Sequence, residues 1–141
     1  MEVENTRAAT EADRHSTARA GRASAVLEDY VELIHDLLTS EGEARPTDLA
    51  RRLGVSHPTA IKSIARLKAL GLVHSKPYRS VFLTDAGRAL ATKVRARHRI
   101  VVDLLQAVGV PPETAERDAE GIEHHVSDAT LDAFVSFLRR G

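Results

Sequence analysis

Two short helical patterns separated by a glycine constrain the fold of this chain most strongly. Residues 47–53 place apolar side chains at helical spacing, with Thr47 expected to cap the helix and Gly54 to end it. Ser56 is then expected to cap a second helix that runs to about Leu70. A short helix, a turn through glycine and a second helix form the helix-turn-helix pattern.

A β-hairpin is predicted directly after this pattern. Residues 72–75 and 80–83 read as two short strands, and the basic residues 76–79 form the loop between them. A hairpin in this place is the wing of a winged helix-turn-helix domain. The apolar residues of the second helix are expected to face the core, and they are Ala60, Ile61, Ile64, Leu67 and Leu70.

The N-terminal 40 residues are predicted to contain a tail and one helix. Residues 1–22 have few large apolar side chains and are expected to be a flexible tail, with a transient helix as the alternative. An amphipathic helix is predicted over residues 25–40, with Asp29 and Glu32 on the face opposite its apolar stripe. These two carboxylates are therefore expected to face solvent or a group outside the winged helix.

The C-terminal part is predicted to be all helical, which makes the fold class mainly α. Thr84 is expected to cap a long helix that ends near Val108 and carries His98 in its apolar stripe. A short helix is expected over about residues 113–126, and Ser127 is expected to cap the last helix.

The formal net charge of 0 conceals a strong segregation along the chain. Residues 45–99 carry 13 Lys and Arg against 2 Asp, a balance of +11. Residues 25–44 carry six acids and no Lys or Arg, and residues 100–141 carry eight acids against three Arg. A basic block of this size is typical of a surface that binds a polyanion, so double-stranded DNA is the expected partner.

The composition excludes several other classes of protein. The absence of cysteine excludes disulfides, iron–sulfur clusters and thiolate zinc sites, and it is typical of a cytoplasmic protein. The sequence shows no signal peptide and no apolar run of the length of a membrane span. We therefore expect a cytoplasmic location and no membrane partner.

The candidate DNA-binding residues lie on the second helix of the motif and on the wing. Helix residues outside the apolar stripe would meet base edges in the major groove, and wing residues would meet phosphates or the minor groove. Helix-turn-helix patterns also occur in proteins that bind no DNA, but the basic block and the wing together favour DNA. The candidates are His57, Thr59, Lys62, Ser63 and Arg66 on the helix, and Lys76, Tyr78 and Arg79 on the wing.

The segment Glu120-Gly121-Ile122-Glu123-His124-His125 is the candidate metal site. Glu120, Glu123 and His124 stand at positions i, i+3 and i+4, so on a helix they share one face. Carboxylates with a neutral imidazole suit manganese, iron(II) or zinc, and oxygen donors favour the harder ions. A solvated acidic face is the alternative for this fragment taken alone. His125 points about 100° away around the helix, so it is expected at the surface or behind the ligands.

The order of the residues in segment 120–125 argues against a metal-dependent enzyme. A metallohydrolase needs an open metal position with a general base, commonly within a His-Glu-x-x-His motif. The segment does not match that motif, and the inverse His-x-x-Glu-His fails because position 120 is Glu. We therefore expect that the protein is not an enzyme.

With these motifs in place, the chain resembles the diphtheria toxin repressor family of metal-dependent regulators, and within it the short manganese transport regulator branch. The resemblance runs from about Leu27 to Leu138. It is carried by the segments 28–32, 97–98 and 118–126, in this order around a winged helix.

The resemblance implies a metal-ligand set and a domain organisation. Iron-responsive members have Met at the place of Asp29 and Cys at the place of Glu120, so the carboxylates here fit the manganese branch. The implied ligands are Asp29, Glu32, His98, Glu120, Glu123 and His124. The implied domains are a winged-helix DNA-binding domain and a helical dimerisation and metal-binding domain, over residues 23–84 and 85–141.

The function expected from the resemblance is manganese-dependent repression of metal uptake genes. Four carboxylates and two imidazoles exceed what one octahedral ion takes, so two Mn(II) ions per subunit are expected. A homodimer would present two recognition helices to a palindromic operator. The alternatives are a repressor that responds to iron(II) or to divalent metals generally, and a winged-helix regulator that needs no metal.

Overall fold

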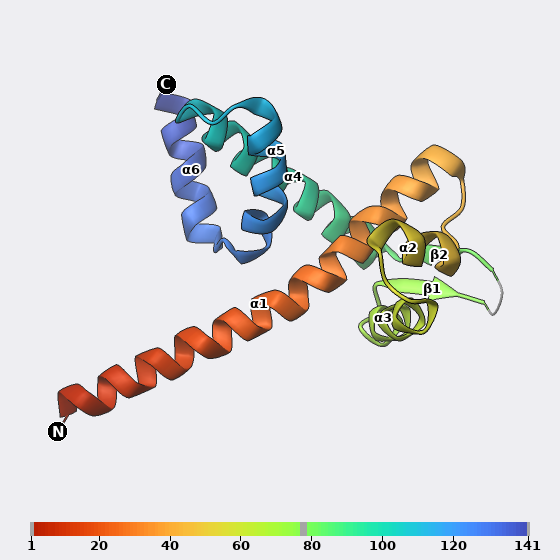
Figure 1. The fold of residues 1–141 in the computed structure, drawn as a ribbon, viewed down its shortest axis with the longest axis horizontal. Coiled ribbons are helices and arrows are strands. Elements are labelled where there is room, and N and C mark those ends of the chain that lie inside the picture. The colour runs from red at the N-terminus through yellow and green to blue at the C-terminus, as the bar shows by residue number, and fades with distance from the viewer. Residues whose placement is uncertain (1, 77–78, 141) are drawn as a thin grey trace. The chain divides into compact units, whose positions relative to one another are not determined.

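The computed structural model describes residues 2–76 and 79–140, with side chains from residue 10 onward. Figure 1 shows the ribbon. The elements are α1 (Glu2–Glu41), α2 (Pro46–Leu53), α3 (His57–Ala69), β1 (Val73–Ser75), β2 (Val81–Leu83), α4 (Asp85–Ala107), α5 (Pro112–Ile122), the 3-10 turn η1 (Glu123–His125) and α6 (Asp128–Arg140). The described chain is mainly helical with one small hairpin, as predicted.

The chain divides into two compact units, one of residues 27–100 and one of residues 1–26 with 101–141. The helix α4 runs without a break through the boundary at residue 100. Among the described residues, no helix combines the length and apolar character that a membrane span requires.

The first helix starts earlier than predicted. Helix α1 begins at Glu2, so the helix predicted over residues 25–40 extends through the segment in which only a transient helix was expected. The reason is local, because this segment is rich in Ala, Glu and Arg, which are strong helix formers. The predicted end is confirmed at Gly42, whose φ of 78° suits glycine. The flexibility of residues 1–22 and the domain boundaries stay predictions.

The helix-turn-helix is confirmed with one change in capping. Gly54 ends α2 in the left-handed region, and the Ser56 hydroxyl caps α3 by accepting a hydrogen bond from the Thr59 N–H at 3.2 Å. Thr47 is not the cap of α2, because Pro46 occupies the first turn and Arg45 precedes it as the cap residue.

Ile61 of α3 and Leu70, the residue that caps its C-terminus, were predicted to face the core but are exposed. Ile61 is 44% exposed and Leu70 is 59% exposed. At 100° per residue, each lies about 90° from the middle of the buried stripe, which is therefore narrower than predicted. The residues of α3 that are buried are Ala60, Ile64 and Leu67.

The wing packs on the same core as these helices. Strands β1 and β2 are antiparallel, with Val73 opposite Leu83 and Ser75 opposite Val81. Their buried side chains join those of α1, α2 and α3 in one hydrophobic cluster. Ala44 is part of it, and its N–H donates to the Ser80 Oγ at 2.7 Å. This core fixes α3 on the surface of residues 27–100.

The predicted starts of α4 and α6 are confirmed, whereas the helix predicted over about residues 113–126 is divided into α5 (Pro112–Ile122) and the 3-10 turn η1 (Glu123–His125). The Thr84 hydroxyl accepts from the Gly87 N–H at 3.1 Å, and the Ser127 hydroxyl accepts from the Thr130 N–H at 3.2 Å. Helix α4 ends at Ala107, so Val108, predicted within its apolar stripe, is instead 62% exposed.

Candidate metal centre and nucleic-acid interface

The surface of α3 presents most of the candidate DNA-binding side chains. His57, Thr59, Lys62 and Arg66 are exposed, whereas Ser63 is half buried because it lies closer to the buried stripe. No acidic residue lies in the first turn of α3, so the positive end of the helix dipole is not offset there. The face of α3 is therefore suited to a polyanion, and the DNA-contacting roles of its residues remain predictions.

The wing adds cationic and aromatic side chains beside its loop. Lys76 and Arg79 are exposed, and Tyr78 lies outside the described residues. The rings of His74 and Phe82 are stacked with centroids 5.6 Å apart. Together with Lys76 and Arg79, they line a shallow hollow of about 370 Å³.

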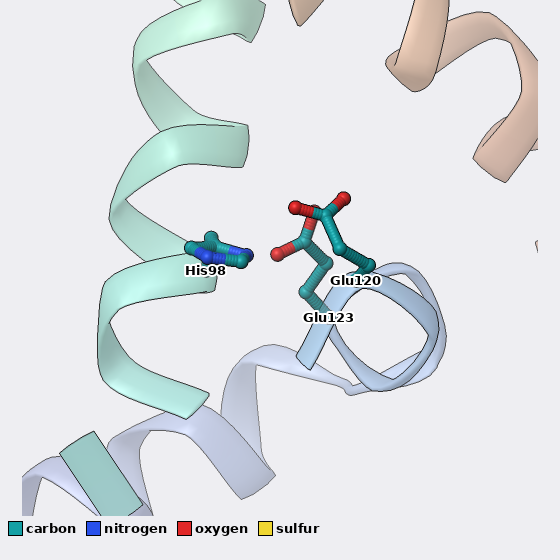
Figure 2. A group of neighbouring side chains, drawn as sticks. All are labelled: His98, Glu120 and Glu123. Carbon is teal, nitrogen blue, oxygen red and sulfur yellow. The ribbon is translucent and has the colours of Figure 1, made fainter. Parts of the chain in front are cut away.

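Three of the six candidate metal ligands converge in the structure. One ligand atom each of His98, Glu120 and Glu123 lies within 4.8 Å of the others. Figure 2 shows the imidazole of His98 directed toward the two carboxylates. His98 comes from α4, Glu120 from the last turn of α5 and Glu123 from η1.

His124 extends this group through Glu123. Its Nε2 lies 3.5 Å from the Glu123 Oε1, and the two residues are 8% and 0% exposed. The turn η1 tightens the chain at this point and buries both side chains. The neighbouring His125 is exposed, as expected from its position around the helix.

The other two candidate ligands lie on α1. Asp29 and Glu32 are half buried, and neither belongs to the group of His98, Glu120 and Glu123 within 4.8 Å. They remain ligand candidates from the resemblance alone.

The donor set fits a hard divalent cation. Carboxylate oxygens of Glu120 and Glu123 converge with an imidazole nitrogen of His98. Glu123 is completely buried, and a buried carboxylate is stable only when it is paired or bound to a cation. Such a set matches manganese or iron(II) better than it matches a soft ion. The side chains present can therefore hold the metal that the sequence motifs imply.

One feature of the region was missed by sequence reasoning. Glu28 and Arg97 are nearly buried and form an ion pair between α1 and α4. Both residues stand within the motifs that carry the resemblance, but neither was assigned a role. A signal was available, because Glu28 precedes the fully buried Val31 by three residues and so shares its helix face.

Comparison with protein-family models matches both halves of the chain to domains of iron-dependent repressors. The model described as iron dependent repressor, N-terminal DNA binding domain, matches residues 23–81. The model described as iron dependent repressor, metal binding and dimerisation domain, matches residues 84–140.

Individual relatives are similar over most of the chain. Transcriptional regulator MntR of Salmonella typhimurium is 54% identical over 115 residues, which are 82% of this chain and 73% of that protein. The HTH-type transcriptional regulator MntR of Geobacillus kaustophilus is 40% identical over 108 residues, 75% of each chain.

Solved structures share the fold. A manganese-dependent transcriptional repressor in complex with manganese has a TM-score of 0.72 and 33% identity, covering 79% of this chain and 52% of its own. The manganese regulator SloR has a TM-score of 0.69 and 26% identity, covering 82% and 54%. This chain thus spans about half the length of these two structures. It belongs to the iron-dependent repressor, or diphtheria toxin repressor, family, whose members are metal-binding transcriptional regulators and not enzymes.

Proposed function

We propose that this protein is a manganese(II)-responsive repressor that binds a palindromic operator as a homodimer in the cytoplasm and lowers transcription of metal uptake genes. The observation that carries the proposal is the convergence of His98, Glu120 and Glu123 in a chain that also presents the exposed α3. A related solved structure is named as a manganese-dependent repressor, which supports the same metal.

The ligand chemistry supports manganese. The candidate set holds four carboxylates and two imidazoles, and the chain has no cysteine to attract softer ions. When bound, the metal supplies positive charge that offsets these carboxylates. Two divalent ions per subunit would offset all four, and titration calorimetry should therefore give a stoichiometry of two Mn(II) per chain.

The exposed apolar residues support the homodimer. Val108, Ile122 and Phe137 are each at least 40% exposed in the C-terminal unit, where a dimerisation domain is matched. Exposed apolar side chains are typical of an interface where they form one contiguous patch, which a dimerisation domain would supply. Light scattering on chelated protein should give the mass of a dimer, and a monomer would contradict a dimer that forms without metal.

Metal dependence is tested by selection from random-sequence duplex DNA. With Mn(II) present, the protein should enrich an inverted repeat whose half-sites are about one helical turn, or a multiple of it, apart. With chelator, no sequence should be enriched. Enrichment of the same repeat under chelation would show a regulator that needs no metal.

Iron(II) is the second candidate effector, because the same oxygen and nitrogen donors accept it. The selection is repeated with Fe(II) under anaerobic conditions and separately with Zn(II). The enrichment of the repeat then ranks the metals by how well they activate DNA binding. We expect Mn(II) to activate fully and Zn(II) only in part, because Zn(II) is satisfied by four ligands. Asp29→Met should narrow this difference, and an unchanged ranking would remove Asp29 from control of selectivity.

A further inference from the structure

The ion pair between Glu28 and Arg97 is unusual for its burial. The two side chains are only 8% and 13% exposed. Glu and Arg are rarely buried to this extent in proteins unless they are paired. A guanidinium also presents its donors as a rigid planar fork, so it fixes the direction of the carboxylate that it binds.

The position of this pair relates it to the candidate ligands. Glu28 directly precedes Asp29 on α1, and Arg97 directly precedes His98 on α4. All four residues belong to the unit of residues 27–100. The pair therefore joins the two helices at the turns from which two candidate ligands project.

A second ion pair between the same helices provides a contrast. Arg95 and Asp36 are also paired, but their side chains are 58% and 47% exposed. Solvent screens an exposed pair, so it constrains its helices little. The neighbouring residues of this second pair are not candidate ligands.

Stability alone does not account for the buried pair. Removing two charges from water costs about as much as their attraction returns, and well-packed apolar side chains in their place are often equally stable. In some proteins, a buried polar group instead fixes one register between two helices.

We infer that Glu28 and Arg97 are positioning residues for the metal site. Arg97 holds the α1 and α4 turns in the register that presents Asp29 and His98 to a divalent cation. It also keeps the Glu28 carboxylate engaged, so that Glu28 does not compete with Asp29 as a ligand. This inference rests on the proposed function, because it takes Asp29 and His98 as ligands.

The test compares apolar replacement of the two pairs. In Glu28→Leu/Arg97→Met, the Tm of the chelated protein should be unchanged or higher, because no charge is left buried alone. Its Mn(II) affinity, measured from free Mn(II) by electron paramagnetic resonance, should fall about 10- to 100-fold, as is typical when groups behind metal ligands are removed. Asp36→Leu/Arg95→Met, the matched control, should keep the wild-type affinity.

A milder variant protects the test against loss of folding. Arg97→Lys keeps the charge but loses the fork, and it should weaken Mn(II) binding while leaving circular dichroism unchanged. Wild-type Mn(II) affinity in both Arg97 variants would overturn the inference and leave the proposed function standing. A wild-type protein that fails to bind Mn(II) would overturn both.

Discussion

The candidate DNA-contacting side chains of α3 and the candidate metal ligands differ in how they are built. Those of α3 come from one segment, residues 57–66, and most of them are exposed. The group of His98, Glu120 and Glu123 comes from separate segments, and Glu123 is fully buried. An exposed side chain meets its partner without reorganising its neighbours. A buried carboxylate is energetically coupled to every charge around it. Substitutions on α3 should therefore change DNA binding alone. Substitutions of His98, Glu120 or Glu123 should also change how much the metal stabilises the fold.

The largest expected effect is that of Glu123→Gln on the stability that the protein gains when Mn(II) binds. A ligand present at about 100 times its Kd stabilises a protein by about 2.7 kcal/mol. The neutral amide should remove most of that gain, because it is a weaker donor to a divalent cation. Urea unfolding with and without Mn(II) measures the difference.

The exposed Glu113 on α5 supplies the control for this prediction. Glu113→Gln should retain the wild-type gain from Mn(II). If Glu123→Gln also retained it, Glu123 would not be a metal ligand, and the contrast between the two regions would fail.

Substitutions on α3 should act on DNA binding and spare stability. Lys62→Ala or Arg66→Ala should weaken operator binding by about 1–3 kcal/mol if the side chain contacts a base, or lower the salt slope by about one if it contacts a phosphate. The free energy of unfolding should stay within about 0.5 kcal/mol of wild type. Fluorescence anisotropy over a range of salt concentrations distinguishes the two contacts.

Arg139, exposed at the end of α6, is the charge-matched control. Arg139→Ala should leave operator affinity unchanged. A Lys62→Ala/Arg66→Ala double variant with full operator affinity would show that α3 is not the recognition helix.

The smallest expected effect is that of the helix-capping residues of the helix-turn-helix on the free energy of unfolding. Ser56→Ala should lower the free energy of unfolding by about 1 kcal/mol, because it removes the acceptor for the Thr59 N–H. Thr47→Ala should change it by less than about 0.5 kcal/mol, because Thr47 caps nothing. Equal losses in urea unfolding would contradict the capping assignment.

Sequence reasoning predicted the features that depend on local chemistry. The caps at Ser56, Thr84 and Ser127 and the left-handed glycine at Gly54 are confirmed, because each acts within a few residues of itself. The Thr47 cap was wrong, since the adjacent proline decides where α2 begins.

Features that depend on packing between segments were less predictable. The exposure of Ile61 follows from how wide a stripe of α3 the core covers, which periodicity does not specify. The Glu28–Arg97 pair joins residues that are 69 positions apart, so no local pattern pairs them. The convergence of His98 with Glu120 and Glu123 was expected from the family resemblance, because the motif spacing alone places only residues 120–124 together.

The proposed function requires that metal binding and operator binding are coupled, and a thermodynamic cycle measures this coupling. Operator affinity is measured by anisotropy with chelator and with saturating Mn(II), and Mn(II) affinity is measured with and without operator. Mn(II) should tighten operator binding about 5- to 150-fold, and operator should tighten Mn(II) binding by the same factor. Operator affinity that is identical with chelator and with Mn(II) would contradict this coupling.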